Sequence, residues 1–439
     1  TAPLKDMLFV LRYLCGLDDL SQLPGCEDLS TELAAQVLEE SGRFASGVLS
    51  PLNAVGDREG AHWEQGVVRM PAGFAPAYRQ FIDAGWNSLP FPAEYGGQGL
   101  PRLLAAPVME MWKSANLSFS LCPMLTSGAI EALLLRGTAL QKQTYLPPMI
   151  EGRWTGTMNL TEPQAGSDLS MVRTKAVGQP DGSYRITGQK IFITYGEHDM
   201  AENIVHLVLA RTPDAPEGVK GISLFIVPKF LVNKDGSLGD KNAVSCGSIE
   251  HKMGIRGSAT CVMNYDGATG YLVGEENKGL AGMFVMMNIA RLGVGVQGLA
   301  QAEGAYQNAV QYAKDRRQGR SLTGVKDPSE KADTLFVHPD IRRMLMEAKA
   351  FTEGMRAFCL WGGIQSDLVH KAQTAEERQN ADDLLSLLMP VIKGYGTDKG
   401  YEVCTNMQQV LGGHGYVEEW GMSQYVRDAR IAMIYEGAN

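Results

Sequence analysis

The spacing of hydrophobic residues divides the chain into three regions. From residue 1 to 153 these residues recur mostly at helical spacing, which predicts a helical first domain with loops at 51–60 and 92–101. From 154 to 277, short runs rich in β-branched and aromatic residues alternate with Gly, Pro, Asp and Asn, which predicts an antiparallel β-domain. The predicted strands include 184–194, 203–210, 221–228 and 260–265.

Helical spacing returns from 278 to 439. Long helices are predicted at 280–317, 339–363 and 381–411, enough for most of a helical bundle, with a solvent loop at 321–333. The order of helical domain, β-domain and helical bundle predicts the α+β fold class. Such an order does not identify a function by itself.

The composition excludes several classes of protein. Forty Lys and Arg stand against 49 Asp and Glu, a net charge of −9, so the chain lacks the broad basic field that attracts nucleic acid. The seven cysteines are odd in number and form no CxxC pair, which argues against a disulfide framework and against a zinc site. We expect no metal, and a reducing compartment.

The segment most like a targeting signal lies at 7–17. Lys5 and Asp6 precede it, Arg12 interrupts it, and it is too short to span a bilayer. We therefore predict an amphipathic helix, no membrane span and a cytoplasmic protein.

The first chemically distinctive motif lies at 158–168 and reads MNLTEPQAGSD. Its hydroxyl and turn-forming residues can present N–H and O–H groups to a phosphate or a polar ring edge, although a turn with a helix cap would use the same residues. The motif resembles the flavin-binding loop of the acyl-CoA dehydrogenase family. The resemblance implies FAD as cofactor, with contacts from Met158, Leu160, Thr161, Gly166 and Ser167.

The segment IFITYG at 191–196 resembles the second flavin strand of the same family. The resemblance implies that Phe192 and Thr194 flank the isoalloxazine ring. Taken by themselves, Phe192 and Thr194 lie on one face of a strand and could equally be packing residues. The family commonly has Trp at the position of Phe192; Phe keeps the stacking surface and lacks the N–H donor.

Two later segments also resemble segments of the family, and the second of them lies near the substrate there. IEHKMGIRGSATCVMNYD at 249–266 resembles the family's KMGIRGS segment, and MNIARLGVGVQG at 287–298 resembles a helix whose arginine lies near the CoA moiety. The matching residue is Arg291, with Asn288 on the same face; Ser167 is also implied as a substrate contact. An internal salt bridge of Arg291 is the alternative.

Two segments resemble family segments that reach the FAD of a neighbouring subunit. YAKDRRQGR at 312–320 supplies Arg316, and NMQQVLGGHGY at 406–416 supplies Gln409, Gly412 and Gly413. A guanidinium suits a pyrophosphate, and paired glycines allow close backbone approach. A solvated basic patch and an ordinary helix end are the alternatives. The resemblance implies a homodimer or homotetramer.

The last motif, YVRDARIAMIYEG at 425–437, resembles the family segment that carries the catalytic base, here Glu436. Removal of a weakly acidic α-proton requires a nearby carboxylate, and burial should raise its pKa toward neutrality. Family members that carry this Glu on the earlier helix would have it at Ala290. Tyr435 and Gly437 are implied substrate contacts. A surface Glu at a turn is the alternative.

The resemblance covers nearly the whole chain and implies the acyl-CoA dehydrogenase fold. The expected domains are an N-terminal helical domain at 1–153, a middle β-domain at 154–277 and a C-terminal helical bundle at 278–439. The chain ends at IYEGAN where the family reads IYEGT and continues, so we expect an incomplete bundle and a fragment of a longer protein. The opening and the 321–333 insertion resemble a long bacterial branch with 3-methylmercaptopropionyl-CoA dehydrogenases and broad-specificity fatty acyl-CoA enzymes.

The implied activity is FAD-dependent oxidation of an acyl-CoA to the trans-2-enoyl-CoA, with electrons passed to an electron-transfer flavoprotein. An acyl-CoA oxidase, which uses oxygen, would share Glu436 and FAD and is the first alternative. The second alternative is a non-catalytic flavoprotein or a nucleic-acid-binding relative, which the charge of −9 and the presence of Glu436 disfavour.

Overall fold

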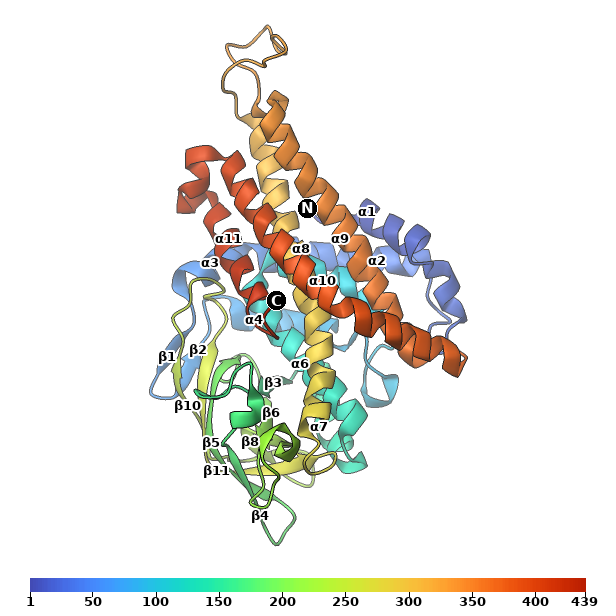
Figure 1. Ribbon diagram of the computed structural model, residues 1–439, viewed down its shortest axis with the longest axis vertical. Coiled ribbons are helices and arrows are strands. Elements are labelled where there is room, and N and C mark those ends of the chain that lie inside the picture. Colours follow the sequence, from blue (N-terminus) through green and yellow to red (C-terminus); the bar gives the residue numbers. More distant parts are fainter. The chain divides into compact units, whose positions relative to one another are not determined.

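A computed structural model describes residues 1–439 apart from the side chains of Asn288 and Ile289 (Figure 1). The chain forms two compact units. One unit holds Thr1–Ala54, Pro101–Leu117 and Arg291–Asn439; the other holds Val55–Leu100 and Ser118–Ala290. We call them the helical unit and the sheet unit, and describe each by itself.

The helices have the following bounds: α1 Leu4–Phe9, α2 Thr31–Phe44, α3 Ser50–Glu59, α4 Phe74–Asp83, α5 Arg102–Ala115, α6 Leu117–Arg136, α7 Ala139–Glu151, α8 Gly279–Asp315, α9 Pro339–Lys371, α10 Ala375–Val410 and α11 Met422–Arg430. The strands are β1 His62–Glu64, β2 Val67–Arg69, β3 Trp154–Asn159, β4 Lys175–Gly178, β5 Tyr184–Thr194, β6 Asn203–Ala210, β7 Ser223–Pro228, β8 Phe230–Val232, β9 Leu238–Lys241, β10 Val244–Ile249 and β11 Thr260–Val273. The three predicted long helices are confirmed as α8, α9 and α10, and the four predicted strands as β5, β6, β7 and β11.

The loop predicted at 51–60 is wrong, because most of this segment forms α3. The sequence shows Pro51 and two glycines, but a π-helical turn at Ala45–Leu49 leads directly into α3. Pro51 therefore lies in the first turn of α3, where its missing N–H costs little. Gly56 allows close packing, since a Cβ there would lie 2.9 Å from the ring of Phe74.

The main sheet of the sheet unit has the strand order β3-β6-β7-β11-β5-β4, with β10 also paired to β11. Every pair is antiparallel except β3 and β6, which run parallel from Trp154 opposite Asn203 onward. The purely antiparallel domain predicted for 154–277 is therefore corrected to a mixed sheet. Strands β6 and β7 are buried along their whole length, which explains their continuous hydrophobic sequences.

The bundle of the helical unit depends on a close crossing of α8 and α10. A Cβ on Gly298 would lie 2.2 Å from the carbonyl oxygen of Gly396, and one on Gly400 would lie 2.5 Å from that of Gly298. Only glycine allows the two backbones to come this near. Hydrophobic side chains of α8, α9 and α10 fill the core beside the crossing; they are Leu292, Val296, Leu299, Met355, Cys359, Met389 and Ile392.

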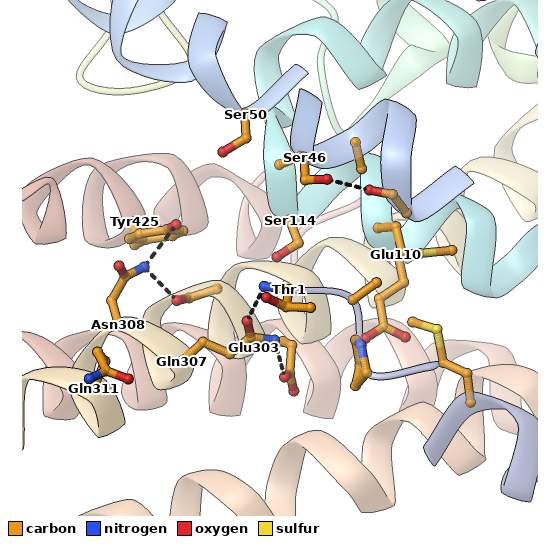
Figure 2. A pocket seen from close by; sticks show the side chains of 18 residues that line it. Thr1, Ser46, Ser50, Glu110, Ser114, Glu303, Gln307, Asn308, Gln311 and Tyr425 are labelled. Carbon is orange, nitrogen blue, oxygen red and sulfur yellow. Dashed lines mark hydrogen bonds between the residues drawn. The ribbon is translucent and has the colours of Figure 1, made fainter. Parts of the chain in front are cut away.

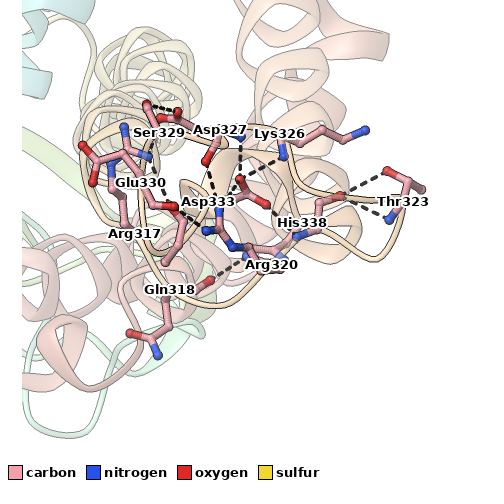
Figure 3. Close-up of polar contacts among 12 residues, drawn as sticks. Arg317, Gln318, Arg320, Thr323, Lys326, Asp327, Ser329, Glu330, Asp333 and His338 are labelled. Carbon is pink, nitrogen blue, oxygen red and sulfur yellow. Dashed lines mark hydrogen bonds and ion pairs between the residues drawn. The ribbon is translucent and has the colours of Figure 1, made fainter.

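The loop between α8 and α9 projects beyond the ends of these helices (Figure 1). Figure 3 shows the carboxylate of Asp333 at the centre of its polar contacts. This carboxylate accepts hydrogen bonds from three backbone N–H groups, those of Ser321, Lys326 and Asp327. Arg320 pairs with Asp333 at 3.3 Å, and Arg317 pairs with Asp327 at 2.8 Å. The loop predicted at 321–333 is thus present, and its fold is held by internal contacts.

Two helices, α6 and α8, are long and apolar enough to cross a membrane by length and composition. Of their apolar stretches, 89% of that in α6 and 62% of that in α8 is buried inside the protein. Core helices of soluble proteins have the same properties, so these helices are weak evidence for a membrane span. Each of the seven cysteines is buried and free.

The helix crossing predicts opposite effects for two glycine substitutions. Gly298→Ala should lower the free energy of unfolding by about 1–3 kcal/mol, because the added methyl group must push α8 and α10 apart. Gly354→Ala on α9 is the matched control, because a Cβ there meets nothing within 4 Å, and it should raise stability by about 0.5–1 kcal/mol. Urea unfolding of both variants measures the difference. Equal effects would contradict the close crossing.

Candidate active site

The exposed aromatic side chain of Phe192 lies at a bulge in β5. Cys261 pairs with Ile193 and Met263 pairs with Lys190, so Ile191 and Phe192 together face a single residue of β11. Phe192 has φ 59°, in the left-handed region, and its side chain is 59% exposed. A non-glycine residue rarely adopts this backbone conformation, and bulges of this kind turn side chains out of a sheet. The bulge therefore presents a flat apolar ring to a ligand.

The segment after β3 is fixed to β5 by a buried ion pair. Lys190 donates to Glu162 Oε1 at 2.8 Å and to the carbonyl oxygen of Leu160 at 2.9 Å. Burial would raise the pKa of Glu162, but the Lys190 ammonium and hydrogen bonds from Thr174 and Arg173 outweigh it and lower the pKa to about 2. The pair is therefore ionised, and it holds the loop at 158–168 in one conformation.

The residues predicted to contact the flavin are at least partly exposed. Met158, Leu160, Thr161 and Thr194 are partly exposed and Gly166, Ser167 and Phe192 are exposed, whereas their neighbours Asn159, Glu162, Ala165 and Ile193 are buried. The Thr161 carbonyl accepts from Ile191 N at 2.9 Å, which ties the loop to the strand that carries Phe192. The sheet unit thus brings these predicted residues to one region with their side chains available.

In the helical unit, Glu436 follows α11 and lies in a left-handed turn. Its φ is 57° and that of Gly437 is 88°. Strain of this kind is retained only where the surrounding structure fixes it, and it gathers at functional sites. The N–H of Glu436 donates to no acceptor among the residues that the structure describes, so it is available to a ligand.

Two cations from neighbouring helices face the Glu436 segment. Lys393 of α10 donates to the carbonyl oxygen of Gly437 and, at 2.7 Å, to Asn439 Oδ1. A Cβ on Gly437 would lie 3.6 Å from Nη2 of Arg291 on α8. Burial raises the pKa of the Glu436 carboxyl group to about 7, although Lys393 and Arg291 both act to lower it. The group is therefore poised to take up or release a proton near neutral pH.

Three further residues were predicted to contact the substrate: Arg291, Tyr435 and Asn288. Arg291 lies beside Gly437, as described, and Tyr435 donates its hydroxyl to Oε1 of Gln297 on α8. Burial raises the pKa of Tyr435, which keeps it a neutral donor. The side chain of Asn288 lies outside the described residues. The substrate contacts of these residues stay predictions.

The residues predicted to reach a neighbouring subunit's cofactor lie at one end of the helical unit. Arg316 follows α8 directly and is exposed; among the described residues its side chain pairs with no carboxylate. Tyr312, one turn earlier, makes a hydrogen bond of 2.8 Å with His414, in the segment after Gln409. Neither Gly412 nor Gly413 would bring a Cβ within 4 Å of another atom of this chain. The surface there is open to a ligand.

A cavity of ≈ 410 Å³ lies in the helical unit (Figure 2), and no predicted site residue lines it among the residues described. Two of its acidic side chains, Glu110 and Glu303, bind the buried guanidinium of Arg356 at 2.7 and 3.0 Å. The ion pairs neutralise part of the buried charge, so these carboxylates support the packing of α5, α8 and α9. The cavity does not coincide with the candidate site.

Sequence reasoning missed three residues that fix the site: Glu162, Lys190 and Lys393. Lys393 had a readable signal, because it lies on the same face of α10 as the buried residues Met389 and Gly396. A lysine at such a position needs a partner. Glu162 and Lys190 had no comparable signal, since their pairing depends on how the loop folds back onto β5.

Comparisons with known proteins find relatives along nearly the whole chain. Family models match residues 31–153 ("Acyl-CoA dehydrogenase, N-terminal domain"), 157–268 ("middle domain") and 277–439 ("C-terminal domain"). The chain is 51% identical to a 3-methylmercaptopropionyl-CoA dehydrogenase of Ruegeria pomeroyi over 99% of its own length and 74% of that protein. It is 38% identical to a broad-specificity linear acyl-CoA dehydrogenase of Mycobacterium tuberculosis, over 99% and 72%. The solved butyryl-CoA dehydrogenase of Megasphaera elsdenii superimposes with a TM-score of 0.76 at 26% identity, covering 93% of this chain and 96% of that one.

The environment of Glu436 predicts an unusual titration in the ligand-free protein. The carboxyl group should be half ionised near pH 7 instead of near 4.5, because burial disfavours its charged form. Carbon NMR of protein labelled at the glutamate carboxyl carbons, with Glu436→Gln to assign the signal, measures the midpoint. A midpoint near 4.5 would show that the carboxylate is solvated and would remove the physical basis for its role.

Proposed function

Because the chain belongs to the acyl-CoA dehydrogenase family and is thus an oxidoreductase acting on acyl-CoA, we propose that it converts a saturated acyl-CoA to the trans-2-enoyl-CoA. FAD is the proposed cofactor, and an electron-transfer flavoprotein is the proposed electron acceptor. The proposed domains are 1–153, 154–277 and 278–439.

The proposal rests on the raised pKa of the Glu436 carboxyl group. A base that removes the α-proton of a thioester must be ionised when substrate arrives and basic enough to hold the proton afterwards. The pKa of Glu436, raised by burial to about 7, meets both needs near neutral pH. Glu436 is therefore the proposed catalytic base.

The residues of the sheet unit fit FAD. The exposed ring of Phe192 offers a stacking surface, and the loop at 158–168 offers hydroxyl and N–H groups beside it. Met158, Leu160, Thr161, Gly166, Ser167, Phe192 and Thr194 are the proposed cofactor contacts. When bound, FAD would supply the hydride acceptor for the substrate's β-carbon.

The backbone of Glu436 can serve a second purpose. Loss of the α-proton places negative charge on the thioester oxygen, which an N–H donor stabilises. The N–H of Glu436 has no acceptor among the described residues, so it is free to donate to that oxygen. Ser167, Asn288, Arg291, Tyr435 and Gly437 are the proposed substrate contacts.

The open surface at the end of α8 supports a cofactor shared between subunits. Arg316, Gln409, Gly412 and Gly413 are proposed to contact the FAD of a second copy, in a homodimer or homotetramer. Arg316 pairs with no carboxylate in the described part of the chain, where Asp327 and Asp333 of the loop pair with Arg317 and Arg320 instead. We also propose a cytoplasmic location, a reducing compartment that suits seven free cysteines.

The acyl group of the substrate is proposed from the names of two relatives. The relatives from Ruegeria pomeroyi and Mycobacterium tuberculosis are named for a thioether acyl-CoA and for linear acyl-CoAs. We propose that the substrate is a thioether acyl-CoA or a linear acyl-CoA.

An acyl-CoA oxidase is the alternative that uses the same residues. It differs only in access of oxygen to the reduced flavin, so reoxidation by air and by an electron-transfer flavoprotein should be compared. Rapid turnover in air with peroxide formation would overturn the dehydrogenase proposal. A non-catalytic or nucleic-acid-binding flavoprotein would show no flavin reduction by any acyl-CoA.

Substitution of the proposed base should separate binding from chemistry. Glu436→Gln should retain bound FAD and lose anaerobic flavin bleaching by about 10²–10⁴-fold, because the amide cannot accept the α-proton. A panel of linear and thioether acyl-CoAs, applied to both proteins, measures the loss and ranks the substrates. Bleaching of the variant at the wild-type rate would show that Glu436 is not the base.

The ion pair under the flavin loop should govern cofactor retention. Lys190→Met leaves the buried Glu162 carboxylate without its ammonium partner, which should cost about 3–5 kcal/mol and loosen the loop. The variant should therefore retain less FAD after gel filtration than the wild type. Lys175→Met, at an exposed lysine of β4, is the control and should retain FAD normally. Equal retention would argue that the loop does not hold FAD.

A further inference from the structure

We propose that Lys393 is a positioning residue for Glu436: its ammonium group fixes the left-handed turn at Glu436–Gly437 and supplies a buried positive charge for the carboxylate. The inference rests on the proposed role of Glu436 as the base. It assigns to α10 a part in the reaction that sequence reasoning did not give it.

Lys393 is buried and holds two residues after Glu436 by hydrogen bonds. The side chain is 4% exposed, and its Nζ donates to the carbonyl oxygen of Gly437 and, at 2.7 Å, to Oδ1 of Asn439. Asn439 in turn donates to Thr397 Oγ1 at 2.9 Å and to Asp398 Oδ1 at 2.7 Å. Lys393 thus holds the backbone directly after Glu436. Thr397 and Asp398, in the next turn of α10, hold Asn439.

The turn needs such support because its backbone conformation is unfavourable. A non-glycine residue in the left-handed region costs of the order of 1 kcal/mol or more, so Glu436 would relax if nothing fixed it. Loss of the hydrogen bond to the Gly437 carbonyl oxygen would add a further cost. The hydrogen bond from Lys393 to the carbonyl oxygen of Gly437 therefore both fixes the strained backbone and supplies this oxygen with a donor.

The position of Lys393 is itself set by the helix crossing. Gly396 and Gly400, one and two turns further along α10, lie against Gly298 of α8 with almost no space between the backbones. The ammonium group therefore emerges from a rigid part of the bundle. A flexible surface lysine could not hold a strained turn in the same way.

The charges around Glu436 come from three elements. Lys393 on α10 and Arg291 on α8 favour its ionised form, whereas burial opposes it. Burial lowers the pKa of Lys393, and the carboxylate of Asp398 on α10 acts to raise it. Among the residues that the structure describes, the neutral Tyr435 and the carboxylate of Asp428 are the further titratable groups named beside the turn. Removal of Lys393 leaves Arg291 as the one described cation acting on the carboxylate, so the group should become harder to ionise.

The experiment compares three variants with the wild type. Lys393→Met removes the charge and both hydrogen bonds, whereas Lys393→Arg retains a charge and donors. Lys399→Met changes an exposed lysine on the same helix that pairs with Glu402. The readouts are bound FAD, the NMR titration of Glu436 in ligand-free protein, and the pH profile of anaerobic flavin bleaching by acyl-CoA. The titration needs no substrate.

In Lys393→Met the titration midpoint of Glu436 and the acid limb of the bleaching profile should both rise by about one pH unit or more. Bleaching should then be about fivefold slower at pH 7 and recover near pH 9, because fewer molecules hold an ionised base. Lys393→Arg should restore the midpoint, and Lys399→Met should match the wild type. Should Lys393→Met not fold, Lys393→Gln replaces it with the same expected shift.

The inference is overturned if Glu436 in the Lys393 variants titrates as in Lys399→Met, whatever the activity. It is also overturned if Lys393→Arg fails to restore the midpoint, since the role would then not depend on the cation. Failure of the proposed function looks different: the wild type itself would show no bleaching with any acyl-CoA, while the titration would still report on Lys393.

Discussion

The contact between the backbones of α8 and α10 is the constraint on which the candidate active site depends. Gly298 and Gly396 allow the helices to meet with no side chain between them, and this fixes the two helices that carry Arg291 and Lys393. Lys393 then reaches the carbonyl oxygen of Gly437, and Glu436 is held in a strained turn beside two cations. The reactivity of the carboxylate follows from a balance between burial, which raises its pKa, and these cations, which limit the rise.

In the sheet unit, too, a functional segment is held in place by hydrogen bonds from a buried lysine. Lys190 is fully buried and bonds to both Glu162 and the backbone of Leu160, which fixes a loop without secondary structure of its own. In each unit a buried lysine donates to a main-chain carbonyl and a side-chain oxygen. Such bonds are strong in a dry interior, and here they orient the loop at 158–168 and the turn at Glu436.

Much of this could be predicted from the sequence, because hydrophobic spacing reports helices and strands directly. The long helices and the four strands were predicted, and resemblance to the family suggested roles for the loop at 158–168, Phe192 and Glu436. Three features could not be. Helix α3 depends on a π-helical turn before Pro51, and the parallel pairing of β3 and β6 depends on chain topology. The ion pair of Lys190 with Glu162 and the hydrogen bond of Lys393 to the Gly437 carbonyl join residues 28 and 44 positions apart. Spacing along the chain carries no information on such partners.

The most direct test of the account is exchange of the substrate's α-proton with solvent. Wild-type protein and Glu436→Gln, each with bound FAD, are incubated with an acyl-CoA in D₂O without an electron acceptor, and deuterium at the α-carbon is measured by mass spectrometry. The account predicts exchange by the wild type and a loss of about 10²–10⁴-fold in the variant, whose amide cannot take the proton. Exchange at the wild-type rate in Glu436→Gln would show that another group is the base.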